Sequence, residues 1–176
     1  MNNVGLCLCV FLIYFTLTPY YCLKVIPERV QIDFYNKSFV EETPVFNVRR
    51  YSRKGSYVVN LEFVSKLVID NTQTVDVLFY EYLHNEYRRS FPELHMKLCD
   101  LINKDIYFGH IMRDAGFKTC PILPGKYAIH NISFHHDFPY VWPFDKGMAE
   151  ISLQNHQNSV MVAKGKVYIT FKQEKN

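Results

Sequence analysis

Side chains suited to metal binding gather in one stretch of the C-terminal half. The cluster comprises His130, His135, His136 and Asp137. Imidazole nitrogens and carboxylate oxygens are common zinc ligands, but neighbours along a strand point to opposite faces, so only some of the four could converge. Their spacing also matches no closed zinc pattern. We therefore interpret the cluster as a polar loop after a strand, and we predict neither a metal site nor a cofactor.

Motifs for catalysis are absent from the sequence. It contains no Gly-x-Ser-x-Gly turn, no His-Glu-x-x-His pair and no glycine loop of the kind that binds phosphate. Glu41 and Glu42 are typical of a solvated turn, and no nucleophile is paired with a visible base. The sequence therefore predicts a protein that is not an enzyme. A hydrolase acting on lipid would need His130 and His136 to converge beside Asp137 in a pocket.

The five cysteines divide into two groups. Cys7 and Cys9 lie in the apolar N-terminal run, and Cys22 lies near its end. Cys99 and Cys120 remain as an even pair, which in an oxidising compartment predicts a disulfide. The alternative is two buried free thiols.

The N-terminus predicts secretion. No charged side chain precedes Lys24, and residues 4–17 form an apolar run of signal-peptide length. A membrane-spanning helix usually needs about 20 apolar residues, so an uncleaved anchor is the weaker alternative. We interpret residues 1–22 as a signal peptide whose cleavage site is not defined, and residues 23–176 as a single domain.

The net charge argues against a nucleic-acid partner, and two sequons predict sites of N-glycosylation. Lysine and arginine number 20 against 17 aspartate and glutamate, an excess of only three, so no nucleic-acid partner is predicted. Asn36-Lys37-Ser38 and Asn131-Ile132-Ser133 are acceptor sequons for N-glycosylation. A glycoprotein is therefore predicted if these asparagines are exposed.

Alternating apolar and polar residues predict that most of the chain is β-strand. The clearest pattern covers residues 57–70, where period two persists for more than ten residues. A turn at residues 71–74 and an apolar alternation at 75–79 predict that this strand returns as a hairpin. The other predicted strands are 28–39, 45–51, 87–98, 126–134, 148–154 and 160–172. The inward set of the last two would be Ala149, Ile151, Leu153, Met161, Ala163, Val167, Ile169 and Phe171.

A single helix is predicted between the two late cysteines. Asp100 is a good N-cap, and Gly116 suits the left-handed position that ends a helix. Leu101, Phe108 and Met112 fall on one side at helical spacing. A Cys99–Cys120 bond would staple this helix and stabilise the chain by roughly 3 kcal/mol.

Many strands, one helix and no alternation of strand with helix predict an antiparallel β-sandwich. The aromatic content is high, with 14 Phe and 13 Tyr. Such side chains can fill the space between two sheets, or they can line an apolar cavity if the sheets splay. Composition alone favours packing, because most apolar residues at sheet spacing are core.

Four short motifs resemble a family of small secreted insect proteins. They are Leu98-Cys99-Asp100, Cys120-Pro121, Gly125-Lys126-Tyr127 and Pro143-Phe144-Asp145-Lys146-Gly147. The family was catalogued as a domain of unknown function and includes the chemosensory B proteins of flies. The resemblance covers roughly residues 60–172. The family is in turn similar to the ML lipid-recognition superfamily, which includes the ganglioside activator and sterol carriers.

This resemblance implies an immunoglobulin-like sandwich of the ML type that holds an apolar molecule between its sheets. The ligand would be a lipid, or a cuticular hydrocarbon pheromone in a chemosensory role, and a membrane receptor is a further partner to consider. The cysteine pair would be the family's disulfide. The candidate pocket residues are Tyr57, Val59, Leu61, Phe63, Leu67, Phe79, Phe108 and Met112. The alternative is an extracellular interaction module with a filled core that acts through its surface.

Overall fold

Strands account for most of the structure. The computed structural model describes residues 21–53, 55–114, 116–117, 119–133 and 142–175. The strands are β1 (Tyr21–Tyr35), β2 (Val45–Arg50), β3 (Tyr57–Ser65), β4 (Gln73–Leu83), β5 (Glu86–Lys97), β6 (Gly125–Ile132), β7 (Lys146–Asn155) and β8 (Val160–Lys175). The described helices are α2 (Leu98–Lys104) and α3 (Phe108–Asp114).

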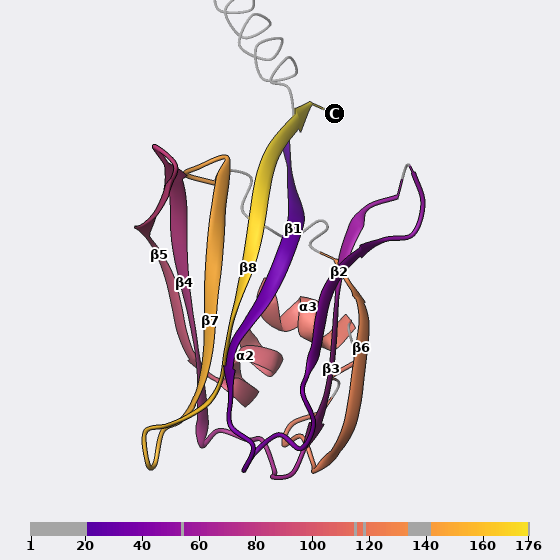
Figure 1. Cartoon of the computed structure of the whole chain (residues 1–176), viewed down its shortest axis with the longest axis vertical. Helices are drawn as coiled ribbons and strands as arrows, with labels where there is room; N and C mark the ends of the chain where they lie inside the picture. The colour runs from indigo at the N-terminus through magenta and orange to yellow at the C-terminus, as the bar shows by residue number, and fades with distance from the viewer. Residues whose placement is uncertain (1–20, 54, 115, 118, 134–141, 176) are drawn as a thin grey trace, which may run out of the picture.

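The strands form two antiparallel sheets that face each other (Figure 1). The larger sheet has the order β1-β8-β7-β4-β5, and the smaller has the order β2-β3-β6. One hydrophobic cluster takes side chains from both sheets, including Val77 and Phe79 of β4 and Ile129 of β6. The predicted mainly β architecture, an antiparallel sandwich, is therefore confirmed.

The alternating pattern sets which face of each strand lies inside. In β4, Val75, Val77 and Phe79 are buried, whereas the intervening Asp76 and Leu78 are only half-buried on the outer face. The predicted hairpin of the last two strands is also confirmed, since β7 pairs with β8 from Lys146 to Asn155. Cross-strand partners point to the same face of a sheet, so the inward-facing residues of β7 and β8 lie side by side in the middle of the larger sheet.

The predicted hairpin between residues 57–70 and 75–79 is wrong. β3 ends at Ser65, and β3 and β4 belong to different sheets. Residues 66–72 cross between the sheets, and Ile69 forms an isolated bridge with Ile122. The inner faces of both strands point into the same core, so their alternating patterns look alike whether the strands pair with each other or face each other.

The predicted single helix is also wrong in two respects. The segment breaks at residues 105–107 into α2 and α3, and Asp100 lies inside the first turn of α2 rather than at its N-cap. Asp105 causes the break, because its Oδ1 accepts hydrogen bonds from the amides of Tyr107, Phe108 and Gly109 and so begins α3. Gly116, with φ +110°, follows α3 in the left-handed conformation as predicted.

Candidate functional site

The space between the sheets is closed differently on its two sides. On one side β1 contacts both β2 and β3, so the two sheets meet directly. On the other side the helices complete the wall, because α2 contacts β4 and β5, α3 contacts β6, and the helices contact each other (Figure 1). The interior between the sheets is therefore bounded by strands on one side and by two short helices on the other.

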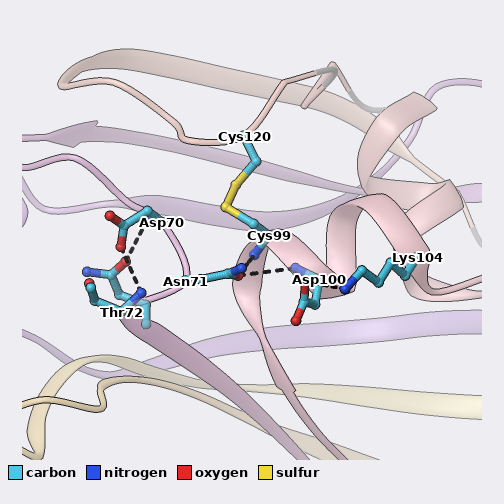
Figure 2. The surroundings of a disulfide bond; sticks show 8 residues. Asp70, Asn71, Thr72, Cys99, Asp100, Lys104 and Cys120 are labelled. Carbon is cyan, nitrogen blue, oxygen red and sulfur yellow. Dashed lines mark hydrogen bonds and ion pairs between the residues drawn. A yellow bond between two sulfur atoms is a disulfide. The ribbon is translucent and has the colours of Figure 1, made fainter.

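A disulfide and an asparagine fix the helical wall (Figure 2). Cys99 of α2 is bonded to Cys120, with 5.5 Å between the Cα atoms, which confirms the predicted disulfide. Asn71, in the crossing segment, accepts hydrogen bonds on Oδ1 from the amides of Cys99 at 3.0 Å and Asp100 at 3.3 Å. The residue at the N-cap position, Lys97, supplies no capping side chain. The Asn71 side chain therefore caps the N-terminus of α2, although Asn71 lies outside the helix.

Close packing joins the two helices. Arg113 donates from Nη1 to the carbonyl of Ile102, which is completely buried. Gly109 is also buried, and a Cβ on it would overlap the carbonyl oxygen of Leu101. Only glycine permits this approach of α3 to α2, so the wall is compact at the break between the helices.

Aromatic side chains fill part of the interior in two groups. On the larger sheet the indole of Trp142 stacks on Phe171 at 4.7 Å and meets Phe79 edge-on at 4.9 Å between ring centroids. On the smaller sheet Phe63 stacks with Tyr127 at 5.4 Å. Both groups contribute to the core, as the composition predicts.

The inner face of the middle strand is not fully covered. Ile151 and Leu153 of β7 are half-buried, although the residues paired with them on β4, Val77 and Val75, are buried. Their partners on β8 are small, Gly165 beside Ile151 and Ala163 beside Leu153. A central strand in a fully packed sandwich would bury such side chains. Ile151 and Leu153 pack against the core, yet part of their side-chain surface stays accessible.

The predicted pocket residues separate into three groups. Val59 and Phe79 are buried. Leu61, Phe63, Phe108 and Met112 are half-buried and pack against the core. Tyr57 and Leu67 are exposed, Tyr57 beside the guanidinium of Arg50 and Leu67 in the loop after β3.

Sequence reasoning did not select the β7 and β8 residues as a site. Ile151, Leu153 and Ala163 were predicted to face inward, but only as packing. The usable signal was the low volume of Ala163 opposite Leu153. Gly165 leaves no comparable room beside Ile151, because a Cβ on it would lie 2.9 Å from the carbonyl oxygen of Gln31 and 3.7 Å from the ring of Phe46.

Two histidines lie on the outer faces of the sheets. His95 of β5 contacts Asp76 of β4 at 2.7 Å, and this hydrogen bond raises the pKa of His95 above its usual value. His130 of β6 lies 3.9 Å from Glu62 on the outer face of the smaller sheet. His135, His136 and Asp137 fall outside the described residues. In the part of the chain that the structure describes, no three potential ligands are grouped to hold a metal ion.

The two sequons differ in their surroundings. Asn36 is half-buried, donating from Nδ2 to the carbonyl of Met161 at 3.4 Å and accepting on Oδ1 from the amide of Ser38 at 2.9 Å. Asn131 is exposed at φ +63°, in an irregular stretch of the β3–β6 pairing, and Oδ1 of buried Asn60 accepts its backbone amide at 2.9 Å.

Comparison with known proteins gives structural likenesses but no sequence match. The sequence matches no protein-family model and none of the curated proteins with which it was compared. Among solved structures, chicken MD-1 complexed with lipid IVa is similar at 12% sequence identity and a TM-score of 0.36. That alignment covers 86% of this chain and 98% of the other. No helix in the described ranges is long and apolar enough to cross a membrane.

Proposed function

We propose that this chain is a secreted, non-enzymatic carrier that holds a lipid or another apolar small molecule between its two sheets. The observation that supports the proposal is the partly accessible inner face of β7 at Ile151 and Leu153, with the small Ala163 beside Leu153. Apolar surface that remains accessible at a central strand favours occupancy by an apolar ligand, because covering it removes both surfaces from water.

The physics of burial sets the size of ligand to expect. Each buried methylene contributes about 0.8 kcal/mol, so about ten methylenes contribute about 8 kcal/mol. Association costs are of similar size, roughly 4–15 kcal/mol. Short-chain molecules would therefore bind weakly, and long-chain fatty acids or hydrocarbons are the appropriate candidates. The resemblance to the chemosensory B proteins makes cuticular hydrocarbon pheromones the first natural ligands to test, and a chemosensory role is part of the proposal.

The test measures displacement of a fluorescent long-chain fatty acid from the protein secreted by eukaryotic cells, after native mass spectrometry for a co-purified lipid. Substituting Ala163 by Phe places a bulky ring on the inner face beside Leu153. Ser152→Phe is the matched control, because Ser152 is half-buried on the adjacent strand and faces outward. We expect A163F to weaken probe binding at least tenfold and S152F to change it less than twofold.

Both variants must be shown to unfold cooperatively, because overpacking usually costs about 1–3 kcal/mol and a misfolded variant would lose probe binding for that reason alone. The single tryptophan, Trp142, lies in the aromatic group of the larger sheet and reports on folding in each variant. A wild-type protein that carries no lipid and binds no probe would refute the carrier proposal. Equal loss of binding in A163F and S152F would refute the assigned location.

Secretion and glycosylation belong to the same proposal. We propose that residues 1–22 include a signal peptide that is cleaved close to Tyr21, where β1 begins. We expect glycan on Asn131, whose side chain is exposed, rather than on Asn36, whose amide is engaged by Met161 and Ser38. The test removes N-linked glycan with a glycan-releasing amidase from the secreted protein and from its N131Q and N36Q variants, and compares their electrophoretic mobility before and after treatment. A mobility shift that survives in N131Q would contradict the assignment.

One observation favours the second candidate, an interaction module that acts through its surface on a receptor. Phe91 is 80% exposed on β5, which is a free edge of the larger sheet. An exposed phenylalanine on an edge strand is a suitable anchor for a protein partner. If F91S no longer binds a receptor on cells that bind the wild-type protein, while its binding of the fatty-acid probe is unchanged, the receptor alternative is favoured. Unchanged cell binding by F91S would count against it.

A further inference from the structure

Two facing loops expose aliphatic side chains at one end of the smaller sheet. The segments are residues 66–68, after β3, and residues 123–124, before β6. They lie opposite each other because Ser65 pairs with Gly125 on one flank and Ile69 pairs with Ile122 on the other. The exposed fractions are 45% for Leu67, 42% for Val68 and 62% for Leu123.

Hydrogen bonds hold these loops in place. Ser65 donates from its hydroxyl to the carbonyl of Leu67 at 2.7 Å, and Tyr127 donates from its hydroxyl to the carbonyl of Leu123 at 2.6 Å. The amides and carbonyls of Ile69 and Ile122 bond to each other at 2.8 Å in both directions. These backbone groups are thus bonded within the protein while the side chains of Leu67, Val68 and Leu123 remain exposed, so the exposure belongs to the loop conformation.

The charges within the two loops are positive. Lys66 and Lys126 are the only charged residues in segments 64–69 and 119–128. Both are exposed, and neither forms an ion pair with a described residue, although Lys66 donates from Nζ to the carbonyl of Lys37 at 3.1 Å. Long lysine side chains can keep their ammonium groups at a polar interface while neighbouring aliphatic tips enter an apolar phase.

Three acidic residues lie on the segments next to the two loops. Asp70 follows the loop, but its carboxylate accepts the amide of Thr72 at 2.8 Å and so belongs to the next turn. Glu41 lies beside β3, where its amide donates to the carbonyl of Val64 at 3.0 Å, and Glu42 follows it. These groups are attached to neighbouring segments, whereas the two lysines are part of the loops that carry the leucines.

We propose that the Leu67–Leu123 surface, comprising Leu67, Val68 and Leu123 with Lys66 and Lys126, docks on lipid bilayers that contain anionic lipid. Fixed aliphatic tips suit insertion at the boundary between head groups and acyl chains, and the lysines complement the negative surface charge. Docking does not depend on the carrier proposal, because the surface lies outside the inner faces of the sheets. If the chain does carry a lipid, this surface is where it would exchange cargo with a membrane.

The test is flotation of the full mature chain with phosphatidylcholine vesicles, with and without phosphatidylserine. We expect binding to the anionic vesicles and at least tenfold weaker binding by the L67S/L123S variant. The K66Q/K126Q variant should lose the preference for phosphatidylserine. The matched control is F91S/L83S, which removes two exposed apolar side chains from the larger sheet and should bind like the wild type.

Three results would overturn the proposal. They are failure of the wild type to float with either vesicle, equal loss in L67S/L123S and F91S/L83S, and a phosphatidylserine preference that survives in K66Q/K126Q. A concentration-dependent dimer that is lost only in L67S/L123S would show that a second copy covers the surface, and would overturn it as well. The A163F variant separates this proposal from the carrier proposal, because it should lose the fatty-acid probe in solution and still float with vesicles.

Discussion

Replacing Asn71 by alanine tests whether the helical wall depends on a cap that comes from another part of the chain. In the structure Asn71 Oδ1 accepts two hydrogen bonds from the first turn of α2, and Lys97 at the N-cap position offers no side-chain acceptor (Figure 2). The substitution therefore leaves the amides of Cys99 and Asp100 without that acceptor.

The size of the effect follows from the surroundings of the two amides. Loss of an N-cap side chain typically costs about 1 kcal/mol, within a range of about 0.5–2. Cys99 is buried, so water replaces the acceptor poorly at that amide, and a buried unsatisfied donor costs about 1–3 kcal/mol. We expect N71A to lower the free energy of unfolding by about 1–2 kcal/mol. An N71D variant keeps an acceptor oxygen and should lose less.

The measurement is guanidinium unfolding followed by circular dichroism and by the fluorescence of Trp142, with linear extrapolation to water. The matched control is N103A, because Asn103 is exposed within α2 and alanine has the higher helix propensity. N103A should leave stability unchanged or raise it by up to about 0.7 kcal/mol. A loss below about 0.5 kcal/mol in N71A, or an equal loss in N103A, would show that the reasoning about the external cap is incorrect.

The remaining predictions concern the disulfide, the core and the outer face. The Cys99–Cys120 bond spans a sequence separation of 21, so the C99A/C120A variant should lose about 3 kcal/mol in guanidinium unfolding; a loss below about 1 would contradict the chain-entropy argument. Ile102 is 0% exposed, so I102A should cost about 2–5 kcal/mol by the same measurement, and a cost below about 1 would mean that the site collapses around the gap. The hydrogen bond to Asp76 raises the pKa of His95, so its NMR titration midpoint should lie above 6.5 and return toward that value in D76N. The pair therefore contributes stability that is present below pH 6.5 and is lost as the pH rises through the folded pKa of His95; an unchanged midpoint in D76N would exclude this cause.

The sequence by itself determined the strands and much of their facing. Period-two alternation located β5, β7 and β8 to within a few residues and located the start of β3 but not its end, because a half-buried strand must place its apolar side chains on one face. It also predicted the pairing of β7 with β8 across a short polar turn, which the structure confirms. The Cys99–Cys120 disulfide followed from the two cysteines that remain beyond residues 1–22.

The tertiary structure alone decided which strands share a sheet and where apolar surface stays accessible. β3 and β4 are consecutive and have similar patterns, yet they lie in opposite sheets, because facing strands and paired strands bury the same alternation. The break between α2 and α3 depends on Asp105, and the start of α2 depends on Asn71 from a distant turn. Leu67 and Ile151 are both aliphatic residues in β-rich segments, but one is exposed in a loop and the other lies half-covered on an inner face. Burial depends on the neighbours that the whole fold supplies, and a local pattern does not contain them.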